Sequence, residues 1–452
     1  MAQCACVAVL LIAVARLAST QETMVTPGLA AEINRIVTPY IVAGDFMGVV
    51  AVQRDGEAPL IVPYGLASVE LSVPHRATDI FMIGSVSKQF TAVAILLLEQ
   101  EGMLKTSDTV SRYLPDLGHG EQITIEQLLT HTSGVADIYS LESFGETAGR
   151  EGTFKAIIGE LGRTELSHRP GSAYVYSNGG YALLAAIIER ASAISYGGYL
   201  ARQIFDPLGM TSTSHDKQGP AVEKRVPGYD PWGRDGLTSV APTSAAYTTG
   251  SGSLWSSAAD LLIWTSALHG GRLLTAASYE KLTRDYGHGY GYGVSVFKRF
   301  ERDVVGHDGR LAGYASDVAR YLEDRITVVV LSNVQSVARD EIRRSVAAAV
   351  FGESFAMPEK QMFLDQQQHA LDELVGVYSF GPGFEVSVSE SDGRLLARAN
   401  EGGYSELVPS SDEEWFSRML YATVRFGRDE AGLIDRLIWG RGDQAPAGRQ
   451  LP

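Results

Sequence analysis

Two groups of strand-like segments, far apart in the sequence, enclose a long helix-like stretch, and this order limits the fold more than any other feature. The first group is residues 47–53 and 60–67, which the turn-forming pair Asp55-Gly56 joins as a hairpin. The second group is residues 292–297, 304–306, 314–321 and 326–331, and its last member is an unbroken apolar run typical of a strand buried on both faces. Helical periodicity predicts helices over residues 29–42, 86–101, 180–191, 258–268 and 340–351.

These segments predict an α/β domain in which the early hairpin joins the late strands in one antiparallel sheet flanked by helices. The helical middle of the chain is expected to form a lobe, with a cleft between lobe and sheet. Residues 371–452 alternate apolar and polar around the turn pair Asp392-Gly393, which predicts a small antiparallel β-barrel. We therefore expect a first domain over residues 21–352, a polar linker over residues 353–370 and a barrel domain over residues 371–452.

The first 20 residues have the pattern of a signal peptide, because an apolar run over residues 5–15 is followed by small residues. This pattern predicts a secreted or periplasmic protein; an unstructured start is the alternative, since Arg16 interrupts the run. No stretch reaches 18 apolar residues, so we expect no stable membrane insertion. Both cysteines, Cys4 and Cys6, lie in this leader, and its removal would leave no thiol for a nucleophile or a metal site.

The acidic composition and the missing motifs exclude several classes of function. A net charge of -15 with a pI near 5.1 argues against a nucleic-acid partner. The chain has no Gly-x-Ser-x-Gly, no His-Glu-x-x-His and no phosphate-binding Gly-x-x-x-x-Gly-Lys motif. We therefore expect no metal and no cofactor, and a small molecule or peptide as the substrate. The sequence does not indicate an oligomeric state.

A Ser-x-x-Lys motif begins at Ser85, directly before a predicted helix and directly after a predicted strand segment. Residues three apart on a helix share a face, so Lys88 is expected to reach the Ser85 hydroxyl and to act as its base. The free N–H groups of the helix start suit a developing oxyanion. The same spacing also occurs at Ser214, Ser278 and Ser295, where this context is missing. The alternative is that Ser85 only caps the helix.

Two further motifs follow in the chain. Tyr176-Ser-Asn178 precedes the predicted helix at residue 180, and the Tyr176 phenol could carry a proton beside Ser85 while Asn178 binds a substrate carbonyl. Alternatively, Asn178 caps that helix. His307-Asp308-Gly309 lies between two predicted strands, where Gly309 would let a substrate backbone approach closely. The alternative is a solvated turn.

In this order, the three motifs resemble those of the serine beta-lactamase and penicillin-binding-protein superfamily. Within it, they resemble the branch that contains class C beta-lactamases, D,D-carboxypeptidases, D-aminopeptidases and related esterases. The resemblance covers roughly residues 30–350, and the tail from Leu371 is similar to the β-barrel appended to many members. Segments that resemble the family are Leu128-Leu-Thr-His-Thr-Ser-Gly134, Tyr176–Leu184, Phe205-Asp-Pro-Leu-Gly-Met210 and Gly252–Asp260.

The resemblance implies that Ser85 is acylated, that Lys88 and Tyr176 share the proton transfers, and that Asn178 holds the substrate amide. His307 and Gly309 would form the third wall of the site, and the backbone N–H groups of Ser85 and Arg310 would bind the oxyanion. Arg310 replaces an expected Gly or Ser, so its side chain would narrow the site.

The beta-lactamases of this arm have a lysine at the position of His307, and a histidine is mostly neutral at pH 7. This difference argues against an efficient beta-lactamase, although Asp308 next to His307 would raise its pKa. The leading hypothesis is a serine hydrolase that cleaves a small ester or a D-amino-acid amide or peptide. A beta-lactamase or D,D-carboxypeptidase is the alternative. A second alternative, from another class, is an inactive scaffold that binds peptidoglycan or self-assembles.

Overall fold

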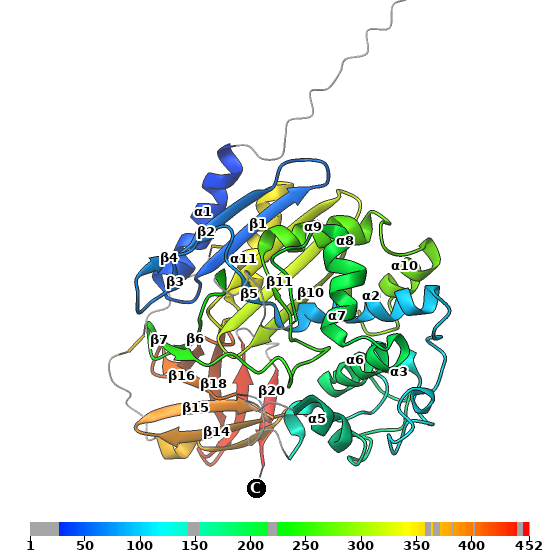
Figure 1. The fold of residues 1–452 in the computed structure, drawn as a ribbon. Helices are drawn as coiled ribbons and strands as arrows, with labels where there is room; N and C mark the ends of the chain where they lie inside the picture. Colours follow the sequence, from blue (N-terminus) through cyan, green and yellow to red (C-terminus); the bar gives the residue numbers. More distant parts are fainter. Residues whose placement is uncertain are drawn as a thin grey trace, which may run out of the picture.

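The predicted antiparallel sheet is present and combines strands from both ends of the first domain. The computed structural model describes residues 27–142, 153–215, 224–357, 363–364, 371–381, 384–400, 403–440 and 446–451, so the predicted signal peptide lies outside the described residues. The sheet has the order β2-β1-β12-β11-β10-β9. Its strands are β1 (Gly48–Arg54), β2 (Leu60–Tyr64), β9 (Ser295–Arg299), β10 (Arg302–Leu311), β11 (Tyr314–Tyr321) and β12 (Ile326–Ser332). In Figure 1 the blue N-terminal strands lie beside the yellow late strands.

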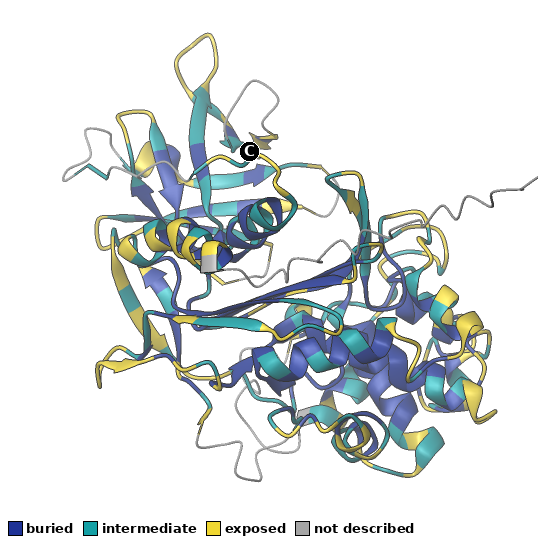
Figure 2. Ribbon diagram, turned by 90° about the horizontal axis from the view of Figure 1, so that it is seen from above, coloured by how far each residue is buried: buried dark blue, intermediate teal, exposed yellow. Residues whose placement is uncertain are grey.

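Strand β12 lies at the centre of the sheet because all seven of its residues are buried. It pairs with β1 on one side, with Val50 opposite Val330, and with β11 on the other, with Val318 opposite Val329. Alternate side chains of these strands enter two separate apolar clusters, one on each face of the sheet. Figure 2 shows the strands as a buried layer inside the molecule. The unbroken apolar run therefore indicated a strand covered on both faces.

Helices cover both faces of the sheet. On one face α1 (Pro27–Val42) packs against α11 (Ala338–Phe351), and both contribute to the cluster around Val50 and Val330. On the other face α9 (Ala258–His269) lies against β12 and β1, next to the helical lobe. In the described part of the lobe the helices are α2 (Ser87–Gln100), α3 (Ile125–Leu129), α5 (Thr153–Leu161), α6 (Asn178–Ser192), α7 (Tyr196–Leu200), α8 (Asp206–Leu208) and α10 (Ala276–Thr283).

Helix α2 is more deeply enclosed than its sequence predicts. The periodicity of its apolar residues indicates one buried face, but every residue from Ser87 to Leu96 is buried. Helices α6, α7 and α10 pack against α2, and the Trp264 ring of α9 stacks on Phe90, so the polar side of α2 is covered as well. Its buried polar side chains are satisfied within the protein; for example, Gln89 Oε1 accepts a hydrogen bond of 2.9 Å from Trp264 Nε1. This enclosure removes Lys88 from bulk water.

Three two-stranded ribbons connect the sheet and the lobe. They pair β3 (Leu66–Ser68) with β4 (Val73–Pro74), β5 (Phe81–Met82) with β8 (Trp255–Ser256), and β6 (Gly228–Trp232) with β7 (Gly236–Val240). Short 3₁₀ turns include η1 (Gly84–Val86), η2 (Val110–Arg112), η3 (Ile138–Ser140) and η6 (Leu371–Leu374). The pair β5–β8 matters most for the site, because β5 leads directly into η1 and α2.

Among the described residues no helix has the length and apolar character needed to cross a membrane.

The C-terminal residues form the predicted β-barrel, which closes through eight antiparallel strands. Tyr378, Trp415 and Leu437 are buried in its core. The strands are β13 (Gly376–Ser379), β14 (Glu385–Ser391), β15 (Arg394–Ala399), β16 (Ser405–Pro409), β17 (Glu414–Ser417), β18 (Ala422–Arg428), β19 (Ile434–Trp439) and β20 (Ala447–Gln450). The predicted linker falls between α11 and this barrel, mostly outside the described residues.

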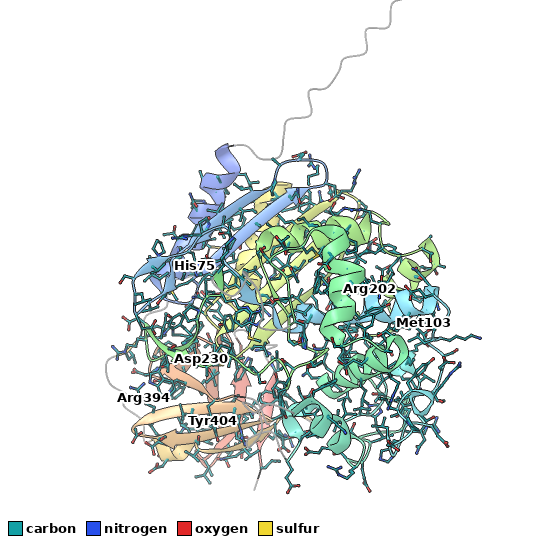
Figure 3. The ribbon with its side chains drawn as sticks, in the orientation of Figure 1. His75, Met103, Arg202, Asp230, Arg394 and Tyr404 are labelled. Carbon is teal, nitrogen blue, oxygen red and sulfur yellow. The ribbon has the colours of Figure 1, made fainter. Side chains whose placement is uncertain are left out.

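Arg418, between β17 and β18, joins the barrel to the first domain. Its Nε donates a 2.7 Å hydrogen bond to Asp45 Oδ1, and both side chains are almost completely buried. Its terminal nitrogens donate to the backbone carbonyls of Gly44 at 2.9 Å and Gly236 at 2.8 Å. Figure 3 shows a second contact region at the edge of the barrel, where Arg394 lies near the β6–β7 ribbon and its guanidinium lies 5.1 Å from the centre of the Trp232 ring. The barrel is therefore attached through a buried polar anchor.

Candidate active site

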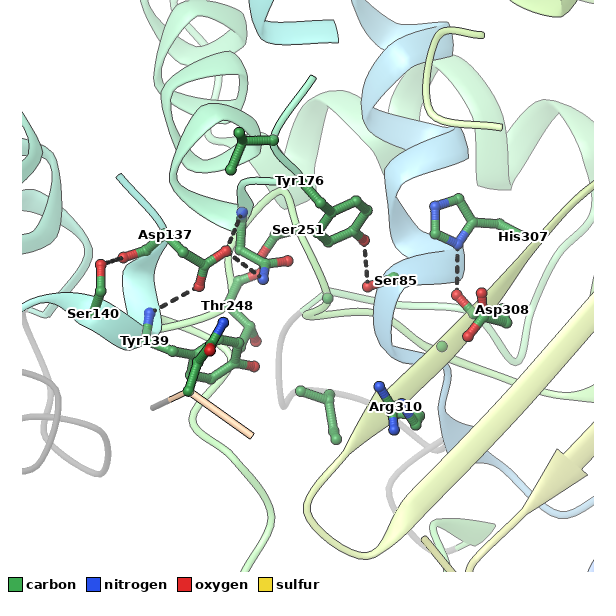
Figure 4. A pocket seen from close by; sticks show the side chains of 16 residues that line it. Ser85, Asp137, Tyr139, Ser140, Tyr176, Thr248, Ser251, His307, Asp308 and Arg310 are labelled. Atoms are coloured by element: carbon green, nitrogen blue, oxygen red, sulfur yellow. Dashed lines mark hydrogen bonds between the residues drawn. The ribbon is translucent and has the colours of Figure 1, made fainter. Parts of the chain in front are cut away.

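Ser85 lies in η1, the turn between β5 and α2, and its side chain is half-buried. This turn requires a glycine before the serine, since Gly84 has φ +50° and a β-carbon there would lie 2.9 Å from the Arg310 backbone nitrogen. The Ser85 side chain caps neither η1 nor α2. Its hydroxyl instead lies within hydrogen-bonding distance of Lys88 and Tyr176 (Figure 4), so the capping alternative does not explain this serine.

The Lys88 ammonium contacts three oxygens. Its Nζ lies 3.0 Å from Ser85 Oγ, 2.7 Å from Asn178 Oδ1 and 2.9 Å from the Ser251 carbonyl oxygen. Burial lowers the pKa of Lys88 to about 7, although the nearby Asp137 and Asp308 carboxylates oppose this shift. The Asn178 and Ser251 oxygens only accept hydrogen bonds. A neutral Lys88 therefore gives its two hydrogens to them and turns its lone pair toward the Ser85 hydroxyl.

Tyr176 contacts the same serine from the other side, with its hydroxyl 2.9 Å from Ser85 Oγ. Burial raises the pKa of this phenol well above its usual value, and the carboxylates of Asp308 and Asp137 add to the effect. The phenol therefore keeps its proton near neutral pH. Its ring lies 4.2 Å from the buried His131 ring, measured between centroids, which fixes the orientation of the hydroxyl. Tyr176 thus presents a protonated phenol to Ser85 Oγ.

Asn178 is the first residue of α6, but it does not cap this helix. Ser177 performs that role, because its side chain accepts a hydrogen bond from the Gly180 N–H. The Asn178 amide oxygen accepts from Lys88, while its amide nitrogen donates at 2.9 Å to Asp137 Oδ2. Asp137 also accepts from the Asn178 backbone N–H at 2.7 Å. Among the described residues no group accepts the second amide hydrogen of Asn178, so this hydrogen can bind a ligand.

His307, Asp308 and Gly309 lie within β10, not in a solvated turn. The buried His307 ring is held through both nitrogens: Nδ1 donates to the Asp308 carbonyl oxygen at 2.5 Å, and Nε2 accepts from the Tyr290 hydroxyl at 2.8 Å. Burial lowers the pKa of His307 to about 4 and outweighs the opposing effect of the Asp308 carboxylate. His307 is therefore neutral at pH 7, and Asp308 forms an ion pair with Arg339.

Gly309 brings β10 into direct contact with η1. A β-carbon on Gly309 would lie 2.2 Å from the Ile83 carbonyl oxygen and 2.9 Å from the Ser85 backbone nitrogen. This approach places the backbones of Ser85 and Arg310 beside each other. Among the described residues the Ser85 N–H donates to no group. The two N–H groups predicted to bind an oxyanion are thus neighbours in space.

A cavity of about 620 Å³ opens in front of Ser85 (Figure 4). The sheet and the lobe form most of its walls, and Asn400 at the end of β15 adds a contribution from the barrel. All seven predicted site residues except the buried Lys88 line this cavity. In the part of the chain that the structure describes, no group of three His, Cys, Asp or Glu side chains is arranged to hold a metal ion.

Four residues near the cavity were missed by the sequence analysis: Asp137, His131, Tyr290 and Arg339. Asp137 orients Asn178, His131 packs on Tyr176, Tyr290 holds His307, and Arg339 pairs with Asp308. His131 lies in the segment Leu128–Gly134 and Asp137 lies three residues after it, so this segment could have indicated both residues. Tyr290 and Arg339 lie in no motif, and only the fold brings them to the site.

Comparison with known proteins identifies the family. The family model described as Beta-lactamase matches residues 33–352. Penicillin-binding protein 4* of Bacillus subtilis is 29% identical over 89% of this chain and 95% of its own length. Protein flp of Staphylococcus aureus is 30% identical over 70% of this chain and 65% of its own length.

Solved structures share the fold. A D-amino acid amidase from Ochrobactrum anthropi SV3 has a TM-score of 0.65 and 24% identity, and covers 72% of this chain and 99% of its own. An octameric penicillin-binding protein homologue from Pyrococcus abyssi has a TM-score of 0.64 and 22% identity, and covers 93% of this chain and 100% of its own. The family match extends over most of the chain, and this protein is a member of the beta-lactamase family of serine hydrolases.

Proposed function

We propose that this protein hydrolyses a small ester or a D-amino-acid-containing amide or peptide through an acyl-enzyme on Ser85. The observation that carries the proposal is the convergence of two proton carriers on one hydroxyl. Lys88 Nζ lies 3.0 Å and the Tyr176 hydroxyl 2.9 Å from Ser85 Oγ. Both distances are within the reach required of a base and its nucleophile.

In the first step, neutral Lys88 takes the proton of Ser85 while Oγ attacks the substrate carbonyl carbon. The negative charge on the carbonyl oxygen is stabilised by the N–H groups of Ser85 and Arg310. The Tyr176 hydroxyl then gives its proton to the leaving group and is reprotonated from the Lys88 ammonium. A water molecule attacks the ester formed on Ser85, with Lys88 and Tyr176 carrying its proton in the reverse sense. Asn178 holds the substrate amide with its remaining hydrogen.

A neutral His307 supports an ester or amide substrate more than a beta-lactam, because it offers no permanent charge to the antibiotic carboxylate. The D-amino acid amidase with the same fold makes D-amino-acid amides reasonable first substrates. The similarity to a penicillin-binding protein extends over 89% of the chain and supports a beta-lactamase or D,D-carboxypeptidase as the alternative. The complete arrangement around Ser85 argues against an inactive scaffold.

The direct test is intact-mass spectrometry after incubation with a fluorophosphonate and, separately, with a penicillin. Adducts of both reagents on Ser85 would favour the penicillin-recognising alternative. A fluorophosphonate adduct alone would support the esterase or amidase. If neither reagent modifies Ser85, the proposed acyl-enzyme is wrong.

The pKa of Lys88 predicts the pH dependence. Lys88 acts as a base only when neutral, and its pKa is about 7. The ratio kcat/KM should therefore rise about tenfold per pH unit below pH 7 and level off above it. The pKa of His307, about 4, lies too low to cause this rise of kcat/KM with pH. Initial rates with a neutral ester, measured over a series of pH values, give this dependence of kcat/KM on pH. A flat profile between about pH 5.5 and 9 would show that Lys88 is not the base.

Substitution Gly309→Ala should lower the reactivity of Ser85 without unfolding the protein. The new β-carbon would meet the Ile83 carbonyl oxygen at 2.2 Å and push η1 away from β10. A displacement near 1 Å at the reacting atoms costs about 100-fold in rate. The rate of fluorophosphonate labelling measures the effect, with Gly403→Ala as control, because a β-carbon there meets nothing within 4 Å and the φ of Gly403 is not in the positive range. Equal labelling of both variants would contradict the close approach of η1 and β10.

A further inference from the structure

The side-chain nitrogen of Lys88 lies over the faces of two aromatic rings. Its Nζ is 4.7 Å from the centre of the Tyr176 ring and 5.4 Å from the centre of the Tyr181 ring. A cation within about 6 Å of a ring centre is attracted by the negative face of the ring. Tyr176 already serves as the second proton carrier in the proposed mechanism, whereas Tyr181 has no role in it.

Among the described residues Lys88 forms no ion pair with a carboxylate. The three oxygens that contact its Nζ are a hydroxyl, an amide oxygen and a backbone carbonyl, and none of them carries a charge. The carboxylates of Asp137 and Asp308 act on Lys88 from a distance. Asp137 is bonded to Asn178, and Asp308 is paired with Arg339. A charge that forms on Lys88 is therefore not neutralised by a direct contact.

Tyr181 is held so that its ring faces Lys88. It lies three residues after Asn178 in α6, so one turn of this helix carries both the ring and the amide oxygen that accepts from Lys88. The side chain is completely buried, and its hydroxyl donates a 2.8 Å hydrogen bond to the Leu129 carbonyl oxygen. The ring cannot turn away from Lys88 without breaking this buried hydrogen bond.

The other titratable groups around Lys88 are uncharged, apart from the two carboxylates. Burial lowers the pKa of His131 well below its usual range and that of His307 to about 4, so both imidazoles are neutral at pH 7. Burial also raises the pKa of the Tyr176 phenol, which keeps its proton. The groups that face Lys88 are thus Tyr176 and Tyr181 from the start of α6, His131 and Asp137 from the loop before it, and His307 and Asp308 from β10.

We propose that the face of the Tyr181 ring stabilises the ammonium that Lys88 becomes when it takes the proton of Ser85. This inference rests on the acyl-enzyme proposed for Ser85. In that step the O–H bond of Ser85 breaks, an N–H bond forms with the lone pair of Lys88, and Nζ gains a full positive charge. Tyr181 is not part of the cavity lining and acts through Lys88, so it is a positioning residue.

An aromatic face suits this base better than a carboxylate would. A carboxylate in contact with Lys88 would keep the ammonium charged in the resting enzyme, and Lys88 could then not accept a proton. A ring face attracts the cation more weakly and carries no net charge of its own. The ring therefore stabilises the product of the proton transfer while burial still holds the pKa of Lys88 at about 7.

The test weakens the negative face of the ring at nearly constant size. Tyr181→Phe keeps the ring face, and phenylalanines with one, two or three fluorine atoms at position 181 then withdraw electrons from it in steps. The measured quantity is the pKa of Lys88, followed by NMR of isotopically labelled lysine and, separately, by the pH dependence of fluorophosphonate labelling at Ser85. The NMR signal is assigned by its absence in Lys88→Arg.

We expect the pKa of Lys88 to fall in the order of fluorination. Relative to Tyr181→Phe, trifluorophenylalanine should move the rise of labelling about 0.5 to 1.5 pH units lower, the range for loss of a cation–ring attraction. The plateau at high pH should fall about two- to sixfold, because the efficiency of a base follows its basicity. If Tyr181 only filled space, altered packing would admit water and raise the pKa of Lys88, which is the opposite direction.

The same series at Tyr378 is the matched control. Tyr378 is also completely buried, and its hydroxyl also donates a 2.8 Å hydrogen bond to a backbone carbonyl, that of Leu374, but it lies in the core of the barrel. Its variants should leave the pKa of Lys88 as it is in the wild type. An equal fall in both series would mean that the effect does not come from the ring beside Lys88.

The outcomes separate this inference from the proposed function. If Ser85 is labelled and the pKa of Lys88 stays constant or rises along the series at position 181, the acyl-enzyme stands and the role of Tyr181 is wrong. If the wild type forms no adduct at Ser85, the acyl-enzyme is wrong. No proton transfer then remains for Tyr181 to assist, whatever the NMR titration gives, and this inference falls with it.

Discussion

Replacing Ser85 by alanine should lower kcat by about 10⁴- to 10⁶-fold and leave the fold intact. The loss is large because no acyl-enzyme forms without the hydroxyl. The fold should persist, since Ser85 is half-buried and Lys88 keeps its contacts with Asn178 and the Ser251 carbonyl. Steady-state hydrolysis of an ester measures the loss, and circular dichroism with a urea titration checks the fold.

Ser295→Ala provides a matched control, because Ser295 begins another Ser-x-x-Lys in this chain. It lies in β9, and we expect its turnover and its fluorophosphonate labelling to equal those of the wild type. The assignment of the nucleophile is wrong if Ser85→Ala retains turnover or is still labelled by the fluorophosphonate.

Replacing Arg418 by alanine should lower the free energy of unfolding by about 3 to 5 kcal/mol, because it leaves the Asp45 carboxylate buried without its cation. Asp45 is only 3% exposed, and burial already raises its pKa to about 6. A carboxyl with a raised pKa in the folded state destabilises the fold as pH rises through that value. The loss should therefore be smaller at pH 5 than at pH 8. Urea titrations at the two pH values measure both effects.

The double variant Asp45→Asn/Arg418→Gln is the control for this prediction. It removes both charges, so it should be more stable than Arg418→Ala. A double-mutant cycle with the single variants Asp45→Asn and Arg418→Gln gives the coupling between the two residues. A loss below about 1 kcal/mol in Arg418→Ala would mean that the ion pair does not anchor the barrel.

The elements that the sequence predicted are those specified by local patterns. The run Ile326–Leu331 and the Asp55-Gly56 turn indicated β12 and the β1–β2 hairpin, and the pairing of both groups in one sheet is confirmed. Strand β10 is longer than predicted, because polar residues from His307 to Arg310 interrupt the apolar pattern. These residues alternate between buried and exposed at the edge of the sheet next to the cavity. A strand with polar residues in such a place has no apolar pattern by which the sequence could indicate it.

The local part of the candidate site was predictable because Ser85 and Lys88 are three residues apart, and a helix turn brings such residues together. The contact of Tyr176 with Ser85 joins residues 91 positions apart, so no local spacing could establish it; the Tyr-x-Asn motif suggested it as one alternative, and the resemblance to the family implied it. Neither pattern nor spacing predicts that α2 is enclosed on all sides. The pKa of Lys88 depends on this enclosure and could not be read from the sequence.

The Arg418 anchor also bears on how such two-part proteins can be recombined in evolution or by design. Arg418 donates to carbonyls of the Ala43–Gly44 turn and of the β6–β7 ribbon, and Asn400 brings the barrel to the cavity. A barrel taken from a relative without an arginine at position 418 would leave Asp45 and these carbonyl oxygens without their donor. The turn that carries Asp45 would therefore have to be exchanged together with the barrel. We therefore expect the two parts to be inherited together, with substitutions at positions 45 and 418 occurring as pairs in homologous sequences.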